Sequence, residues 1–445
     1  MTGLPVRPPA PFRAARAARN RSRAGRSAAF ASVAASIAVT VTLAGLIVAR
    51  NAAAAGAAGA AGAAVATVGA PAASTAGPVV AWGDNHDGQI GDGTTVTRDQ
   101  PVGVLLPSGT VVSAVATGGK FSLALTSTGT VLAWGHNLDG QLGDGSTADS
   151  LVPVAVALPK GTVVTAIAAG GGHSLAVTAA GHVLAWGENQ YGQLGNGTAV
   201  ASDVPVRVRL PRGTRVVAVR ASYNYSIALT AAGKVLTWGY NGSGQLGNGF
   251  HTASEIPVRV RLPKNTTVKA IATGGFDGLA LTSAGRVLAW GDNRYGQLGT
   301  GTRRSTDVPV QVKLPAGTRV VALGGGSQHT LALTSKGRVL AWGQNQYGQL
   351  GNGTKRNSDV PVAVRLPAGV SVKAVSAGGG FSVALTSAGQ ILAWGNNAFG
   401  QLGDGGTTVA VRPVTVSLPA GLRALALAAG PTTRHNLAVV AQTTP

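Results

Sequence analysis

The chain has 445 residues, of which 66 are Gly and only 11% are charged, whereas an ordinary soluble domain has roughly 25% charged residues. It contains no Cys, which excludes disulfides and thiolate metal sites. The low charge excludes a coiled coil, and the 45% hydrophobic content argues against a disordered chain. The net charge of +21 makes nucleic acid or an anionic surface a partner to consider, once the charge is located.

The amino terminus has the pattern of a targeting segment. Residues 1–26 carry seven Arg and no acid, and residues 28–49 form an uncharged apolar run. Such a run is long enough to span a ~30 Å hydrocarbon core as a helix, and the basic flank is typical of the side that stays in the cytoplasm. We expect residues 1–50 to export the rest, either as a cleaved signal peptide or as an uncleaved membrane anchor. The alternative is a buried helix of a globular domain.

Residues 51–77 are low-complexity Ala and Gly, which predicts a linker. Residues 1–50 contain eight Arg and no acid, which leaves +13 of the net charge to the remainder. More than a third of the excess charge therefore belongs to the targeting segment. What is left permits an anionic partner but no longer argues strongly for nucleic acid.

Residues 78–445 consist of seven copies of one unit of 52 residues. Every copy contains Trp-Gly-x-Asn followed by Gly-Gln-Leu-Gly-x-Gly, with Ile90 in place of Leu in the first copy. Internal repeats of this length indicate a solenoid or a propeller. The Trp residues mark the repeat and are Trp82, Trp134, Trp186, Trp238, Trp290, Trp342 and Trp394.

Each unit contains four short apolar runs, which in the second unit are residues 111–117, 121–127, 130–135 and 151–158. Runs of this length, rich in β-branched residues and bounded by Gly, Asn, Ser or Pro, predict strands. Four strands per repeat and seven repeats predict an all-β, seven-bladed propeller. The first run has the smallest side chains and suits the crowded axis, whereas Pro and charge in the fourth run suit an outer edge.

The ends of the repeat region predict a closed ring. The chain enters the repeats at residues 79–83, in the third strand of a unit, and leaves after residues 422–428 and 436–440, which match a first and a second strand. Two strands from each end would complete the seventh blade. Closure would remove the large exposed edge of an open array.

The repeated Trp-Gly-x-Asn-x-x-Gly-Gln-Leu-Gly-x-Gly motif, preceded by a Ser-Leu-Ala-Leu-Thr strand, resembles the repeat of the RCC1 (regulator of chromosome condensation) family. The resemblance covers residues 78 to about 440 and suggests a bacterial exported RCC1-like propeller. The founder of that family is a nuclear guanine-nucleotide exchange factor that also binds chromatin. Relatives include secreted bacterial inhibitors that cap enzymes with one propeller face. The export segment, and the lack of an insertion like the founder's GTPase-contacting wedge, argue against exchange activity here.

Two positions vary within the constant motif and are candidates for a binding face. We expect them on loops at one end of the blades, where Tyr and Phe side chains are typical binding anchors; ordinary loop variation is the alternative. The residues after Trp-Gly are Asp84, His136, Glu188, Tyr240, Asp292, Gln344 and Asn396. The residues before Gly-Gln-Leu-Gly include Tyr191, Tyr295, Tyr347 and Phe399, with Asp87, Asp139 and Ser243 in the other copies.

A basic patch is expected where Arg303 and Arg304 lie 52 residues before Lys355 and Arg356, at equivalent places in neighbouring blades. Such a patch fits an anionic surface polymer, an acidic protein face or nucleic acid. The basic residues of the outer strands are better explained as edge protection; they are Arg207, Arg209, Arg259, Arg261, Lys313 and Arg365.

The sequence contains no motif that predicts a catalytic, cofactor or metal site. The Gly-rich loops lack the Lys and the following helix of a phosphate-binding loop, and seven copies indicate a turn with positive φ instead. His173, His329 and His435 share a repeat position with aromatic residues, which indicates packing and not metal binding. The 15 acids are dispersed, although opposite blades could still supply the carboxylate pair of a glycosidase.

The sequence therefore predicts an exported, non-catalytic protein-binding module, of the scaffold or inhibitor kind. The alternatives are a cell-wall or carbohydrate polymer binder, which needs an aromatic shelf, and a lyase or hydrolase, which needs acids or His converging at the axis. An exchange factor is the reading least compatible with export.

Overall fold

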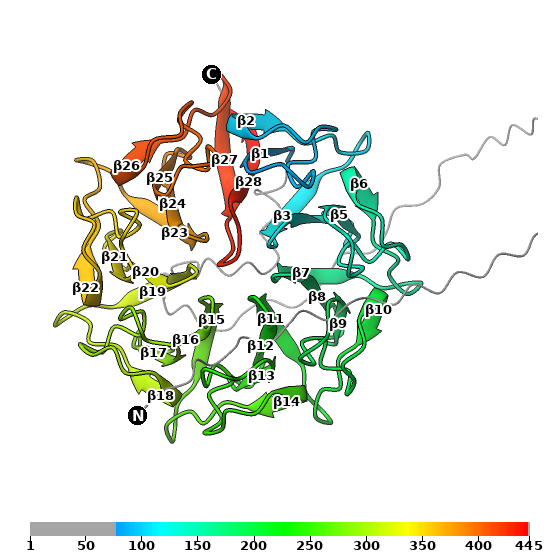
Figure 1. Cartoon of the computed structure of the whole chain (residues 1–445), viewed down its shortest axis with the longest axis horizontal. Helices are drawn as coiled ribbons and strands as arrows, with labels where there is room; N and C mark the ends of the chain where they lie inside the picture. Colours follow the sequence, from blue (N-terminus) through cyan, green and yellow to red (C-terminus); the bar gives the residue numbers. More distant parts are fainter. Residues whose placement is uncertain (1–76, 444–445) are drawn as a thin grey trace, which may run out of the picture. The chain divides into compact units, whose positions relative to one another are not determined.

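The computed structural model describes residues 77–443, and this segment forms a ring of seven four-stranded antiparallel sheets (Figure 1). The seven-bladed propeller predicted from the repeats is thus confirmed. The predicted targeting segment and nearly all of the linker lie outside the described residues. Within residues 77–443 there is no helix long and apolar enough to cross a membrane.

The strands of the described part follow the repeat, with boundaries within one or two residues of the apolar runs for the three inner strands. They are β1 (Val79–Gly83), β2 (Arg98–Gly103), β3 (Val112–Thr117), β4 (Phe121–Thr126), β5 (Val131–Gly135), β6 (Ser150–Ala155), β7 (Val164–Ala169), β8 (His173–Thr178), β9 (Val183–Gly187), β10 (Ser202–Arg207), β11 (Val216–Ala221), β12 (Tyr225–Thr230), β13 (Val235–Gly239), β14 (Ser254–Arg259), β15 (Val268–Thr273), β16 (Asp277–Thr282), β17 (Val287–Gly291), β18 (Thr306–Gln311), β19 (Val320–Gly325), β20 (His329–Thr334), β21 (Val339–Gly343), β22 (Ser358–Ala363), β23 (Val372–Ala377), β24 (Phe381–Thr386), β25 (Ile391–Gly395), β26 (Ala410–Thr415), β27 (Leu422–Ala428) and β28 (His435–Gln442).

Within a blade the strands lie in chain order from the axis outward, as in β11-β12-β13-β14. The small-residue run is innermost and the Pro-containing run outermost, as predicted, and Figure 1 shows the outer strands around the rim. Pro tolerates this place because the outer edge needs no ladder hydrogen bond. The third strands are fully buried over their length, for example Val131–Gly135, because blades pack on both of their faces.

The seventh blade is built from both ends of the described segment, in the order β2-β1-β28-β27. Strand β1 pairs with β28 from Val79 opposite Val439 to Gly83 opposite His435. The predicted closure is therefore confirmed, and it removes the pair of exposed sheet faces and edges that an open array would carry.

Each Trp side chain is 0% exposed and joins two blades. The indole Nε1 of Trp134 donates to the backbone carbonyl oxygen of Gln89 at 2.9 Å, and Trp186 bonds Gln141 in the same way at 2.9 Å. The pairs are 45 residues apart, so the carbonyl belongs to the preceding blade. A buried indole N–H needs such a partner, and the repeat supplies one at every seam.

The Gly-Gln-Leu-Gly loop is held by the Asn of the motif. Asn137 Oδ1 accepts from the backbone N–H of Leu142 at 2.8 Å, and its Nδ2 donates to the carbonyl oxygens of Ser146 and Ala148, each at 3.0 Å. Gly143 has φ +68°, and a Cβ there would lie 2.5 Å from Trp186 Nε1. The predicted structural role of these glycines is confirmed, since both positive φ and close packing exclude a side chain.

Candidate binding face and axial cavity

The antiparallel order of the strands gives the ring two different faces. In the blade β3–β6, residues 118–120 and 136–149 connect strands at one end, and residues 127–130 and 156–163 at the other. We call the first end the long-loop face and the second the short-loop face; the other blades follow the same plan. All of the predicted binding-face residues lie on the long-loop face.

The positions after Trp-Gly are less accessible than predicted. Asp84, Asp292 and Gln344 are only 8%, 2% and 8% exposed, and the Asp292 carboxylate accepts a hydrogen bond from Arg294 Nε at 3.0 Å. These three side chains stabilise the loops and are not available as surface contacts. The other four are half-buried, namely His136, Glu188, Tyr240 and Asn396.

The positions before Gly-Gln-Leu-Gly are more accessible. Their backbone N–H groups are held by the Gln side chain two residues later, as for Tyr191 and Gln193 Oε1 at 2.9 Å, which leaves the side chains at the surface. Tyr191 and Tyr347 are each 37% exposed. Asp139 is exposed, and the remaining side chains are half-buried, namely Asp87, Ser243, Tyr295 and Phe399.

Four aromatic side chains form one cluster across three neighbouring blades of the long-loop face. Tyr191 and Tyr240 meet edge to face with ring centroids 5.0 Å apart. Tyr240 meets Phe276 at 6.2 Å, and Phe276 stacks on Tyr223 at 5.1 Å. Tyr223 and Phe276 lie in the connections between the first and second strands of their blades, which also belong to the long-loop face. Neither residue is among those predicted for the binding face. Their signal was present, since other copies have Gly or a polar residue there.

A depression of ≈ 560 Å³ adjoins this cluster, and Tyr223 of the cluster is one of the residues that line it. Lys120, Tyr347 and Arg434 also line the depression, and the Arg434 guanidinium lies 4.9 Å from the centre of the Phe399 ring. Tyr and Arg are the residue types that most often carry binding energy at protein interfaces. The long-loop face thus combines a hollow with aromatic and basic anchors.

Glu188 lies beside the aromatic cluster in a partly dry environment. Burial raises the pKa of its carboxyl, the nearby Asp139 raises it further, and hydrogen bonds from Gln190 and Asn224 oppose the shift. The Asn224 Nδ2 atom donates to Glu188 Oε1 at 3.1 Å. A carboxylate held in this way can accept a hydrogen bond from a partner at the edge of the cluster.

One group of side chains on the long-loop face could hold a metal ion. Asp87, His136 and Asp149 bring three ligand atoms within 4.8 Å of one another across a blade seam. His136 Nδ1 lies 3.5 Å from an Asp87 oxygen and 3.4 Å from an Asp149 oxygen, and Lys120 Nζ reaches Asp87 at 3.4 Å. No metal site is predicted from the sequence, and it is the fold that brings these three residues together. The cationic Lys120 weighs against a second cation there.

The predicted basic patch is exposed and lies on equivalent loops of two neighbouring blades. Arg303, Arg304, Lys355 and Arg356 are all exposed. Asn293 and Asn345 donate through Nδ2 to the carbonyl oxygens of Arg304 and Arg356, each at 2.9 Å. The backbone is therefore fixed while the four charged side chains remain free to meet an anionic group.

The shared position of the buried histidines has a packing role, as predicted. His173 Nε2 donates to Ser226 Oγ of the next blade at 2.9 Å, and Ser226 Oγ donates to the Gln193 carbonyl oxygen at 2.8 Å. Burial lowers the pKa of His173 and His329 to about 3 and that of His435 to about 4. These imidazoles are neutral at physiological pH and bridge blades.

Asp277 occupies the same repeat position and has no such bridge. Its side chain is 1% exposed, and neither carboxylate oxygen has a hydrogen-bond partner. Burial raises the pKa of Asp277 well above its ordinary value, and the neighbouring Asp292 raises it further. A carboxyl in a space shaped for His, Phe or Tyr is a cost to the fold.

The two faces differ sharply in charge. None of the 15 acids lies in a loop of the short-loop face: nine are in the connections between third and fourth strands, five are at the second position of an outermost strand, and Asp277 starts β16. The short-loop face carries exposed basic side chains, which are Lys160, Arg212, Arg215, Lys234, Lys264, Arg286, Arg319, Lys336, Arg338 and Arg423. Within residues 77–443 none of these forms an ion pair.

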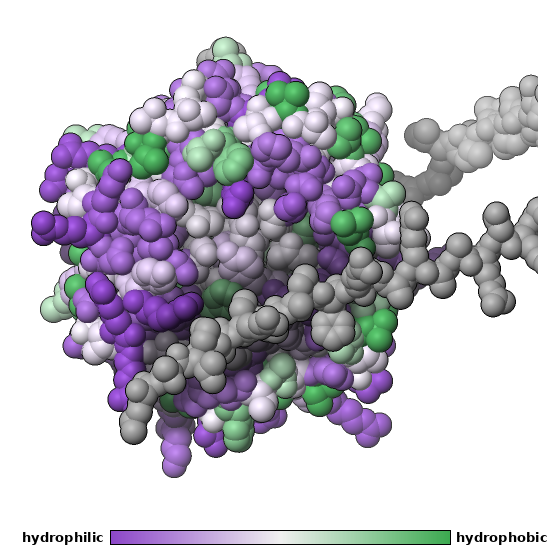
Figure 2. Space-filling view, viewed as in Figure 1, coloured by the Kyte–Doolittle hydropathy of each residue, from purple (hydrophilic) through white to green (hydrophobic). Residues whose placement is uncertain are grey.

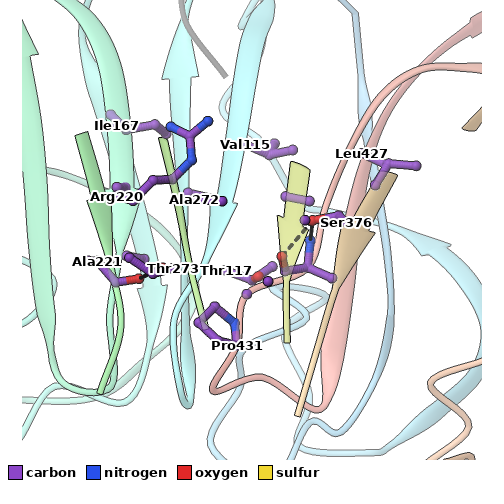
Figure 3. A pocket seen from close by; sticks show the side chains of 18 of the residues that line it. Val115, Thr117, Ile167, Arg220, Ala221, Ala272, Thr273, Ser376, Leu427 and Pro431 are labelled. Carbon is purple, nitrogen blue, oxygen red and sulfur yellow. Dashed lines mark hydrogen bonds between the residues drawn. The ribbon is translucent and has the colours of Figure 1, made fainter. Parts of the chain in front are cut away.

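The innermost strands of all seven blades enclose an axial cavity of ≈ 110 Å³. Figure 2 shows the visible face hollowed at its centre, with hydrophilic residues around the hollow. The lining is mostly Ala, Gly, Val and Leu, with the hydroxyls of Thr117, Thr273 and Ser376 (Figure 3). Among residues 77–443, Arg220 is the only charged residue of the lining. Sequence reasoning missed it, although the other copies have Ala, Gly or Ser at its repeat position.

Comparison with known proteins agrees with this architecture. The family model described as an RCC1-like domain matches residues 70–436. The chain belongs to the RCC1-like domain family. The resemblance seen in the repeat motif is thereby confirmed, and the match spans all seven blades of the RCC1-like propeller.

Two curated relatives share about a third of their aligned residues with the chain. The ultraviolet-B receptor UVR8 of Arabidopsis thaliana is 34% identical over 328 residues, which cover 74% of each chain. The E3 ubiquitin-protein ligase HERC2 of Homo sapiens is also 34% identical, over 374 residues. That alignment covers 82% of this chain but only 8% of HERC2, so the similarity concerns one segment of a far longer protein.

Solved structures show the same fold. Human WBSCR16 is 26% identical with a TM-score of 0.74, covering 82% of this chain and 100% of that one. Prp20p of Saccharomyces cerevisiae, studied with Gsp1p and histones, is 22% identical with a TM-score of 0.74, covering 85% and 94%. At that identity the likeness to Prp20p concerns the fold alone.

Proposed function

We propose that this RCC1-like propeller is a non-catalytic protein-binding module that contacts its partner through the long-loop face. The observation that carries the proposal is the aromatic cluster of Tyr191, Tyr223, Tyr240 and Phe276, which is only partly buried and spans three blades. Partly exposed aromatic side chains beside a hollow are typical of interface anchors.

The geometry of the cluster favours a protein over a polysaccharide. Tyr240 meets Tyr191 at an interplanar angle of 67° and Phe276 at 70°, so the rings do not form one flat shelf for sugar rings. The adjoining depression offers charged and amide groups of both donor and acceptor type, including Lys120, Gln328 and Arg434. A surface that mixes polar and aromatic side chains is typical of protein–protein interfaces.

A hydrolytic role is disfavoured by the same depression. Within the described part of the chain, Asp84 is the only carboxylate that lines the depression, and glycoside hydrolysis uses two carboxyl groups facing one bond. No carboxylate of residues 77–443 lines the axial cavity. The proposal is therefore a scaffold or inhibitor-like role in which the face binds and does not transform its partner.

The proposal also places the propeller outside the cytoplasm, supported by the basic segment 1–26 and the apolar run 28–49. The chemistry of such a sequence favours insertion with the basic end inside. Fractionation and amino-terminal sequencing of the native protein test this part alone. A soluble cytoplasmic protein that still begins at Met1 would overturn export and leave the binding face untouched.

The binding face is tested by affinity capture from the native cell surface, with the full chain as bait. We expect a protein to be recovered, and the double variant Tyr240→Ala, Phe276→Ala to bind it roughly 30-fold more weakly, as for a hot spot of about 2 kcal/mol. Phe250→Ala is the matched control, because Phe250 is 59% exposed and lies outside the cluster.

Two outcomes would contradict the proposal. One is recovery of polysaccharide without any protein, which would favour the cell-wall polymer alternative. The other is equal binding of a captured protein by the original chain and the double variant, which would move the interface away from the aromatic cluster. Thermal melts of each variant establish that the propeller remains folded.

A further inference from the structure

The axial cavity contains a charge that the repeat does not require. Arg220 lies in the innermost strand β11, and its side chain extends along the cavity wall beside Ile167 (Figure 3). The equivalent residues of the other blades are all small, namely Ala116, Ala168, Ala272, Gly324, Ser376 and Ala428. The six small residues show that packing of the blades around the axis does not require an Arg. Arg220 therefore has a role other than ring packing.

Arg220 is half-buried, and its guanidinium has few partners within residues 77–443. Its one hydrogen bond in the structure runs from a guanidinium nitrogen to the carbonyl oxygen of Val219 at 2.7 Å. A guanidinium has five N–H donors, and within residues 77–443 Arg220 forms no ion pair. Burial lowers the pKa of Arg220 to about 10, so the group is still charged at neutral pH. A charge that is partly removed from water without a partner is a cost to the folded chain.

A second polar group of the cavity is also without a partner. Thr117 is 3% exposed, and its Oγ1 makes no hydrogen bond. The comparable hydroxyls are satisfied, since Ser376 Oγ donates to the Ala429 carbonyl oxygen at 2.7 Å and Thr273 Oγ1 to that of Ala221 at 3.3 Å. The cavity of ≈ 110 Å³ is several times the roughly 10–15 Å³ that one water needs. It therefore has room for a small polyatomic ligand.

The charge around the cavity has one sign on the short-loop side. Lys269 and Lys373 are the second residues of the innermost strands β15 and β23, at their short-loop ends. Burial lowers the pKa of both, and the neighbouring Arg319 and Arg423, respectively, lower it further. Like charges held this close, on a face whose loops contain no acids, raise the local concentration of anions at the short-loop end of the axis.

We infer that the axial cavity binds a small oxyanion of the phosphate class, with the guanidinium of Arg220 as its charged partner. The planar fork of Arg donates two parallel hydrogen bonds to such a group, and the basic short-loop face adds a favourable field for an anion. The ligand is free inorganic phosphate or the phosphoryl group of a small metabolite. The lining reaches Gly430 and Pro431 at the long-loop end of the axis, but it includes none of the four residues of the aromatic cluster. The inference does not depend on the function proposed above.

Titration of the full chain with inorganic phosphate, followed by calorimetry and thermal melting, tests the site. We expect saturable binding that raises the melting temperature. Arg220→Ala should weaken phosphate binding by about tenfold or more, the loss expected for one charge-assisted hydrogen-bonded partner. The variant should itself fold well, because Ala stands at this position in four other blades. Arg338→Ala is the matched control, since Arg338 belongs to the same basic face but not to the cavity lining.

A parallel titration with glycerol phosphate distinguishes the two sources of the phosphoryl group. Arg220-dependent binding of both ligands indicates a free oxyanion site, and Arg220-dependent binding of glycerol phosphate alone indicates a small phosphomonoester. Equal affinity of the original chain and Arg220→Ala overturns the inference. So does an absence of binding by either ligand at millimolar concentration, or an equal loss in Arg338→Ala, which would indicate general surface attraction.

Discussion

The indole Nε1 of Trp82 donates a hydrogen bond of 3.1 Å to the backbone carbonyl oxygen of Gln401, which follows it by 319 residues. The other six Trp side chains make the same bond over 45 residues, such as Trp238 to Gln193 at 2.8 Å. The seam that closes the ring therefore has the same bond as the internal seams. Closing this seam has a larger entropic cost than forming an internal seam, because segments far apart in the unfolded chain must be brought together.

We predict that Trp82→Phe and Trp238→Phe lower the free energy of unfolding by similar amounts. Each removes one buried hydrogen bond, worth about 1 kcal/mol, and part of the ring volume. At the closing seam Asn436 Nδ2 also donates to the Gln401 carbonyl oxygen, at 2.9 Å, so that oxygen keeps one partner. Urea unfolding measures both variants. A loss several times larger at Trp82 would show that the closing seam is the weak point.

The glycine pair Gly143 and Gly109 separates backbone strain from crowding. Both have positive φ, +68° and +75°, but a Cβ at Gly143 would lie 2.5 Å from Trp186 Nε1, and one at Gly109 would have nothing within 4 Å. We predict that Gly109→Ala costs roughly 1 kcal/mol from the left-handed backbone alone. Gly143→Ala should cost at least about 2 kcal/mol more, because Trp186 must move. Equal losses in urea unfolding would contradict the close packing of this loop.

Replacing Asp277 by His should stabilise the propeller at neutral pH. His at this position bonds a hydroxyl of the next blade, as His329 bonds Ser382 Oγ at 2.9 Å, and Thr330 stands at the matching place beyond Asp277. The gain expected from removing an unsatisfied buried group is about 1–3 kcal/mol. Asp277→Ala is the control, which removes the carboxyl without the bridge and should gain less. A less stable Asp277→His would mean that the carboxyl has a use in the native protein.

Stability should fall as the pH is lowered from about 6.5 toward 4. The pKa of His173 and His329 is about 3 in the folded chain and that of His435 about 4, against roughly 6.5 in an unfolded chain. In this window the unfolded state binds protons that the folded state cannot. Each histidine then costs up to about 1.4 kcal/mol per pH unit.

Asp277 opposes this trend, because its raised pKa keeps a proton on the folded chain above the unfolded value near 3.9. Glu188, whose pKa is also raised, opposes it in the same direction. Three histidines outweigh these two carboxyls, so the net loss in acid remains. His173→Phe, which copies the residue of other blades such as Phe121, should flatten the slope by about one histidine's share. Unfolding curves at several pH values measure it; an unchanged slope would contradict the assignment to buried neutral imidazoles.

Sequence reasoning located the face of the candidate site but not its composition. Of the residues predicted for the binding face, Tyr191 and Tyr347 are exposed. Three others are buried, namely Asp84, Asp292 and Gln344. The reason is local: the Asp292 carboxylate is held by Arg294 Nε at 3.0 Å, whereas Tyr191 is held through its backbone N–H by Gln193 Oε1 at 2.9 Å. Nothing in the spacing of the motif distinguishes these two arrangements.

The fold itself followed from the chain alone, because a 52-residue period with one Trp per unit leaves few ways to bury four short strands except against the next copy. Ring closure followed as well, since each end supplies the strands that the other lacks. The tertiary structure decided what lies together across the seams: Tyr223 on Phe276, Asp87 beside His136, and Arg220 in the axial cavity. It also showed that the loops of the short-loop face contain no acid, so that the net charge of +13 is distributed unevenly between the two faces. Those relationships depend on the angle between blades and on side-chain direction, which a period in sequence does not encode.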